Sequence, residues 1–120
     1  MTQKDIAINF LNKVAFGDVQ TGYDLYTAPD FVHHNQYFKS DRASLLTAMQ
    51  EAHESSPNKA LDVKYCYEDG DTVITHSLVS KDDMDIAVVH IFRFENHKIA
   101  ELWDLGQVID PNSPNELGLF

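Results

Sequence analysis

The spacing of apolar residues changes around Pro57, and this change constrains the fold more than any other feature of the sequence. Before it, apolar residues recur at helical spacing, as in Ala7, Phe10, Leu11 and Val14. After it, they alternate as on one side of a strand, as in Leu61, Val63, Tyr65 and Tyr67. Helices followed by strands with short turns are typical of an α+β domain whose helices cover a curved, mainly antiparallel sheet. A pocket can form between two such layers.

Start and stop signals predict the boundaries of three helices. Thr2 can cap a first helix, which Gly17 ends, and a short second helix covers residues 19–26. A third helix begins after Asp41 and runs through roughly Ser55.

The remaining segments are predicted as strands, loops and a tail. Residues 31–36 are too short and too polar a segment for a core strand. After the first strand, which ends at the turn Asp69-Gly70-Asp71, we expect strands over about 72–80, 85–94 and 98–108. The apolar tail over 110–120 folds back as a lid on the pocket, docks on a second subunit, or frays.

Two ionisable residues, His90 and Asp104, lie in the last two strands, which together predict an antiparallel hairpin. If the connection has an odd number of residues centred near His97, both side chains point to one face, whereas a two-residue turn would separate them. We favour a three-residue loop and the odd register, because it forms one charge pair and one aromatic–aliphatic pair. These are Arg93 with Glu101 and Ile91 with Trp103.

On that face, His90 and Asp104 have mainly apolar neighbours. The neighbours are Val88, Phe92, Phe94, Ala100, Leu102 and Gly106. Because an unpaired buried charge is costly, the two side chains either bond to each other as a structural pair or line a cavity for a polar ligand. The residues alone leave both alternatives open.

Composition narrows the class of partner. A chain of 120 residues that is 43% hydrophobic fits one domain over 1–120. Its formal net charge of −10 and its scattered Lys and Arg residues disfavour nucleic acid and anionic membranes as partners.

Cys66 is the only cysteine, so neither an internal disulfide nor a thiolate zinc site can form. No stretch approaches the ~20 apolar residues of a membrane span, and no signal pattern opens the chain, so we expect a cytoplasmic protein.

A resemblance to a known family is carried by three segments: Phe31-Val32-His33-His34-Asn35, His90 to Glu95, and Lys98 to Asp104. They resemble the SnoaL-like polyketide cyclase branch of the nuclear transport factor 2-like (ketosteroid isomerase-like) superfamily, and this resemblance implies that the α+β domain is a conical α+β barrel enclosing a pocket. The resemblance implies that Asp104 is the catalytic acid and base, that His90 assists it, and that His34-Asn35 lies at the site. The chain departs from the family pattern at three positions: Val88, His97 and Leu102.

The expected function is therefore cofactor-independent proton transfer on a small hydrophobic carbonyl compound, by an aldol-condensation (cyclase) or isomerase reaction. Burial would raise the pKa of Asp104 into a useful range, and His90 would donate a hydrogen bond or shuttle the proton. The residues expected to bind substrate are His34, Asn35, Tyr37, His76, Phe92 and Trp103.

Other hypotheses remain. The chain could be a non-catalytic small-molecule-binding module of the same fold, and His76 could be a satisfied core histidine. A homodimer is expected through the sheet face opposite the pocket, which carries Val89, Ile91, Trp103 and Leu105. A metal site is a weaker hypothesis, because its four candidate ligands lack tight spacing. These are His34, His76, His90 and Asp104.

Overall fold

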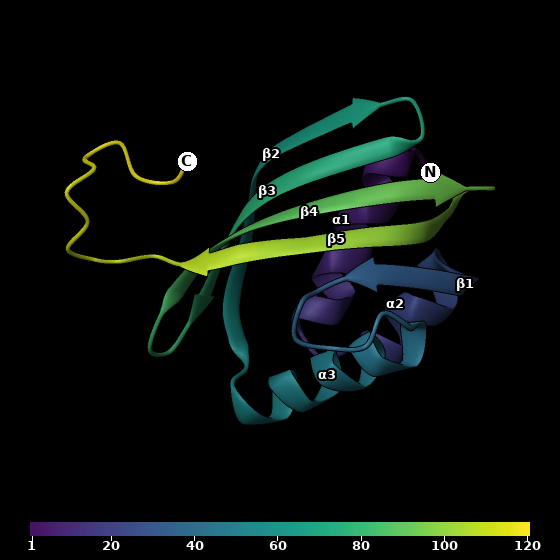
Figure 1. The fold of residues 1–120 in the computed structure, drawn as a ribbon, viewed down its shortest axis with the longest axis horizontal. Helices are drawn as coiled ribbons and strands as arrows, with labels where there is room; N and C mark the ends of the chain where they lie inside the picture. The colour runs from purple at the N-terminus through teal and green to yellow at the C-terminus, as the bar shows by residue number, and fades with distance from the viewer.

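The computed structural model describes residues 1–120 and confirms the α+β fold. Its three helices are α1 (Gln3–Ala15), α2 (Val19–Tyr26) and α3 (Arg42–Ser55). Its five strands are β1 (Thr27–His34), β2 (Asn58–Asp69), β3 (Thr72–Lys81), β4 (Asp85–Glu95) and β5 (Lys98–Val108). The strands form one curved sheet in the order β1-β5-β4-β3-β2, and the helices gather on one side of it (Figure 1). No helix combines the length and the apolar character that a bilayer crossing requires.

The helices form where the sequence predicts them. The side chain of Thr2 accepts a hydrogen bond from the backbone N–H of Asp5, and the Asp5 carboxylate accepts one in return from the backbone of Thr2. The predicted apolar face of α1 is buried, and Phe10 makes edge-to-face contacts with Tyr23 of α2 and Phe92 of β4, at centroid distances of 5.3 and 6.3 Å. These contacts bind the helical layer to the sheet.

Residues 31–36 were predicted not to form a core strand, and the structure has residues 31–34 in a strand at the edge of the sheet, which the sequence pattern did not predict. Residues 27–34 form β1, an edge strand that runs parallel to β5. Its side chains alternate, so that Phe31 and His33 are buried while Val32 and His34 are exposed. The partner strand comes from the far end of the chain, so the local pattern could not reveal the pairing.

The sequence predicted that Leu61, Val63, Tyr65 and Tyr67 lie on one side of β2. Only Leu61 and Val63 do so together, because the strand contains a bulge after Val63. Val63 pairs with Ser77 whereas Tyr65 pairs with His76, so Lys64 is an extra residue in a β-bulge. The bulge turns Tyr65 and Tyr67 outward, where their rings stack on each other at 6.4 Å. Cys66 packs against the core in their place.

The C-terminal tail lies on the outer face of the sheet, opposite the helices. The ring of Phe120 stacks on His76 at a centroid distance of 4.8 Å, and Leu119 lies in a shallow groove with Val89 and Leu105. Figure 1 shows the tail passing beyond the end of β5, away from the helices. The tail therefore does not cover the space between helices and sheet.

Candidate active site

The hairpin of β4 and β5 brings His90 and Asp104 together by a route that differs from the predicted one. The turn has two residues, Asn96 and His97, whose φ values of 49° and 62° identify it as type I′. On its own, a two-residue turn would direct the side chains of His90 and Asp104 to opposite faces of the sheet. However, Phe94 pairs with Ile99 and Arg93 with Glu101, so Ala100 is an extra residue in a bulge.

This bulge restores the predicted register beyond the turn. His90 pairs with Asp104, Ile91 with Trp103 and Arg93 with Glu101. The register prediction is thus confirmed, and the predicted three-residue loop is wrong. Both ionisable side chains face the helices, with exposed side-chain fractions of only 11% and 20%.

Asp104 is held at both of its carboxylate oxygens. Nε2 of His90 lies 3.3 Å from Oδ1, and Nδ2 of Asn35 donates a hydrogen bond to Oδ2 at 2.9 Å. The backbone N–H of Tyr37 donates to Oδ1 of Asn35, which fixes the nitrogen end of this amide towards Asp104. Nδ1 of His90 is buried without a partner.

These contacts reverse the predicted direction of the pKa shift of Asp104. Burial of the carboxyl raises its pKa, as expected. The hydrogen bond and charge of His90 together with the hydrogen bond from Asn35 outweigh burial, so the pKa lies below its usual value. The prediction of a raised pKa is therefore wrong, and Asp104 is a carboxylate at neutral pH.

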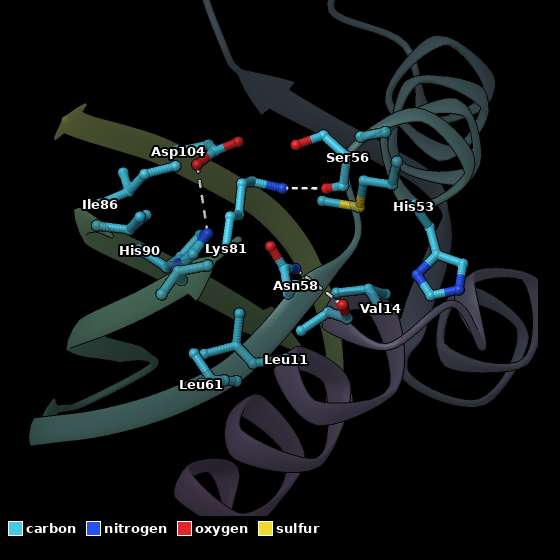
Figure 2. A pocket seen from close by; sticks show the side chains of 15 residues that line it. Leu11, Val14, His53, Ser56, Asn58, Leu61, Lys81, Ile86, His90 and Asp104 are labelled. Carbon is cyan, nitrogen blue, oxygen red and sulfur yellow. Dashed lines mark hydrogen bonds and ion pairs between the residues drawn. The ribbon is translucent and has the colours of Figure 1, made fainter. Parts of the chain in front are cut away.

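A cavity of about 210 Å³ lies between the helices and this part of the sheet. Its walls are mainly apolar and come from α1, α3 and strands β2 to β4, as in Leu11, Val14, Met49, Leu61, Val79, Ile86 and Val88. Figure 2 shows His90 and Asp104 on the sheet side, with Leu11 and Val14 on the helix side. Asp104, Ile86 and Val88 also border an open groove beside Asn35 and Tyr37, so Asp104 lies where the groove meets the cavity.

The structure places only some of the predicted binding residues near this pair. Asn35 contacts Asp104, and Phe92 packs against the ring of His90 at 5.9 Å as part of the core. Tyr37 borders the open groove and is 78% exposed.

Three other predicted residues do not line the cavity. His76 and Trp103 lie on the outer face of the sheet, because strand alternation directs Thr75 and Leu102 inward instead. His34 stacks on Trp103 at 4.7 Å and bonds to Glu101, although it also borders the open groove. His76 and Trp103 are thus separated from Asp104 by the sheet, whereas His34 shares the groove with Asp104.

This arrangement also separates the four candidate metal ligands. His34 and His76 are on or beyond the outer face, while His90 and Asp104 face the helices. No group of three His, Cys, Asp or Glu side chains has the geometry of a metal site.

Two residues of the site were missed by sequence reasoning. His33 is the inward histidine of its pair: its Nδ1 accepts from the backbone N–H of Asn35, and its Nε2 bonds to the Lys39 carbonyl at 2.5 Å. Lys81 lines the cavity because β3 continues one residue beyond the predicted end, and alternation with Val79 directs it inward. The alternation of β3 was visible in the sequence and would have placed Lys81 if the strand had been extended.

Three helices on a curved five-stranded sheet, with a pocket between them, define the nuclear transport factor 2-like class of α+β domain. Residues 8–102 match the model of the SnoaL-like domain, so the chain belongs to the SnoaL-like domain family. The sequence matches no functionally curated protein.

Solved structures agree with this class. A nuclear transport factor 2-like protein of unknown function from Burkholderia xenovorans is 18% identical, with a TM-score of 0.73 over 96% of this chain and 88% of that chain. A candidate polyketide cyclase from Acidithiobacillus ferrooxidans is 16% identical, with a TM-score of 0.73 over 88% and 87%. A candidate hydroxylase from Streptomyces galilaeus is 18% identical, with a TM-score of 0.73 over 88% and 78%. At these identities the likeness demonstrates the fold alone.

Proposed function

We propose that this protein is a cofactor-independent enzyme of the lyase or isomerase type, which moves a proton at the carbon next to a carbonyl group of a small, mainly apolar substrate. The supporting observation is the Asp104 carboxylate, which His90 and Asn35 hold ionised at the edge of an apolar cavity. In this proposal Asp104 is the base, His90 orients it and exchanges the proton, and Asn35 is a positioning residue.

The reaction begins when an oxygen of Asp104 takes the α-proton and the electron pair of the C–H bond passes into an enolate. In an isomerisation, the proton returns to another carbon of the substrate. In an aldol condensation, the enolate carbon attacks a second carbonyl, and the proton returns to the alkoxide that this attack creates. No electrons leave the substrate in either reaction, so the step balances without a redox partner.

The lowered pKa of Asp104 restricts the substrate further. A carboxylate with a low pKa is a weak base, so transfer is efficient only from a carbon acid that is itself activated. A carbon between two carbonyl groups meets this condition, whereas the α-carbon of a simple ketone does not. We therefore expect 1,3-dicarbonyl compounds to react best.

Asp104 lines two adjoining spaces, the apolar cavity of about 210 Å³ and the groove of about 590 Å³ beside Asn35 and Tyr37. Pockets for drug-sized ligands measure ~300–1,000 Å³, so a small substrate fits the cavity and a larger one must extend into the groove.

The test is the exchange of α-protons for solvent deuterium in small 1,3-dicarbonyl compounds, followed by NMR and compared with the rate in buffer alone. Asp104→Asn should lower the enzyme-dependent rate by ~100-fold or more at a temperature where its melting curve shows the variant to be folded. Asp83→Asn is the matched control, because Asp83 is exposed in the β3–β4 loop and away from the cavity. Wild-type exchange in Asp104→Asn would refute the proposal, and ligand binding without any exchange would indicate a binding module instead.

We also propose that the chain forms a homodimer through the outer face of the sheet. Apolar side chains gather there, including Leu105, which is 50% exposed, and the partly exposed Val89, Ile91 and Trp103. Sedimentation should show a dimer that Leu105→Asp shifts towards the monomer, and a monomeric wild-type protein would contradict this assembly.

A further inference from the structure

The cavity contains one cationic side chain that the reaction described above does not use. Lys81 is the only Lys or Arg among the 15 residues that line it. The side chains of β3 alternate, so that Val73, Thr75 and Ser77 are buried on the inner face and Val79 and Lys81 line the cavity. The direction of Lys81 is therefore a consequence of strand register and not of a flexible loop.

The ammonium group of Lys81 has donors to spare. It donates one hydrogen bond, to the carbonyl oxygen of Ser56 at the C-terminal end of α3, as Figure 2 shows. A cation is favourable at a helix C-terminus, and this accounts for one of its three N–H groups. Lys81 forms no ion pair with Asp or Glu, whereas Lys59 on the exposed surface pairs with Asp82 at 3.7 Å.

The strand register places the two charges of the cavity at different levels of the sheet: Asp104 is level with His90, Lys81 follows the Ser80–Asp85 pair, and Val88, Ile86 and Val79 lie between these levels. Asp104 already has His90 and Asn35 as partners, so its negative charge is compensated locally. Apolar side chains of Val79, Ile86 and Val88 line the same sheet wall. A ligand that matches this order has a carbonyl end at Asp104, an apolar middle and an anionic end at Lys81.

The surroundings of Lys81 favour a carboxylate over a phosphate. Phosphate groups are usually held by several donors, such as a helix N-terminus or an arginine fork. Here the neighbouring helix presents its C-terminal carbonyl end, and the protein has a formal net charge of −10. One ammonium group in such a setting suits an anion with a single charge.

We propose that the substrate is a small oxo acid, a 1,3-dicarbonyl compound that carries one carboxylate at the far end of an apolar chain, and that Lys81 binds this carboxylate. The inference rests on the proposed function of Asp104 and specifies the substrate class of that site. Lys81 is thus a specificity-determining residue.

The experiment measures binding alone, with straight-chain oxo acids of four to eight carbons as probes that carry the carboxylate and one carbonyl group, and compares them with their primary amides, which match them in shape but carry no charge. Dissociation constants come from NMR titration of the full chain. Wild-type protein should bind the best acid at least tenfold more tightly than its amide, and the chain length of that acid reports the spacing between Asp104 and Lys81. Lys81→Met should raise the dissociation constant of the acid at least tenfold and change that of the amide less than twofold.

Two further variants separate binding from folding. Lys81→Met loses the contact with Ser56, which can lower its melting temperature. Lys81→Arg keeps the charge and should therefore retain most of the preference for the acid over the amide. Lys59→Met removes an exposed lysine outside the cavity and should bind like wild type. Phosphonate analogues of the same length should bind more weakly than the acids.

The outcomes distinguish this inference from the proposed function. Equal binding of acid and amide, no binding of any acid at millimolar concentration, tighter binding of phosphonates, or an equal loss of both ligands in Lys81→Met would each overturn the role of Lys81. Undiminished proton exchange in Asp104→Asn, together with an intact preference for acids, would refute the proposed reaction and leave the substrate class standing.

Discussion

Asp104 is surrounded by contacts that favour its charged form. Because burial is outweighed by His90 and Asn35, its folded-state pKa lies below that of the unfolded chain. The carboxylate therefore contributes stability above the unfolded-state pKa, and this contribution is lost as the pH falls through the lowered folded-state pKa. Catalysis should depend on pH in the same direction, because Asp104 must be deprotonated to act as a base. The fall in rate on the acidic side of the pH profile should therefore occur at lower pH than for an ordinary aspartate.

At this scale, Asn35→Ala should raise the pKa of Asp104, because one hydrogen bond to the charged form is lost. The acidic limb of kcat/KM should move to higher pH in parallel. Both are measurable, the first by a carbon NMR titration of the Asp104 carboxyl and the second from rates across pH. Asn112→Ala, in the exposed tail, should change neither, and an unmoved titration in Asn35→Ala would contradict the assigned contact.

The β4–β5 hairpin is the element that creates the site. A two-residue turn alone would place His90 and Asp104 on opposite faces of the hairpin. The extra residue in the bulge at Ala100 returns them to the same face. The turn requires positive φ at His97, a conformation that costs an L-residue ~1–2 kcal/mol. Glycine is the preferred residue at this position of a type I′ turn.

His97→Gly should therefore stabilise the protein by ~0.5–1 kcal/mol, after the greater freedom of glycine in the unfolded chain is subtracted. The midpoint of denaturant unfolding measures this change. His97→Ala keeps the backbone strain and should not stabilise the protein. If alanine stabilised it as much as glycine, the histidine side chain and not the backbone conformation would be responsible.

At the scale of the whole molecule, the sheet separates two surfaces with different roles. The inner face holds the cavity and the acid–base pair, while the outer face holds His76, Trp103 and the end of the tail. A chain that ends at Ile109 should therefore keep its rate of proton exchange within about twofold, because the tail contacts only the outer face.

The exchange assay and a melting curve of the shortened chain would check this expectation. A large loss of exchange with an unchanged melting temperature would show that the tail reaches the cavity. Sedimentation of the same chain would report whether Leu119 and Phe120 limit access to the outer face.

Much of the fold was predictable, because it depends on patterns among neighbouring residues. Helical spacing predicted α1 to α3, and alternation with turn signals predicted β2 to β5. The edge strand β1 was not predicted, since its only partner, β5, follows near the end of the chain. The bulges at Lys64 and Ala100 were also missed, because an extra residue leaves little trace in a local pattern.

By itself, the sequence determined the three helices, strands β2 to β5, the family, and the pairing of His90 with Asp104, because periodicity and cross-strand preferences act over short stretches. Only the tertiary structure decided that His33 and not His34 faces inward, that Asn35 reaches Asp104, and that Lys81 lines the cavity. It also decided the sign of the pKa shift of Asp104. A pKa and a cavity wall are sums over groups from several elements, and their distances exist only once the chain has folded.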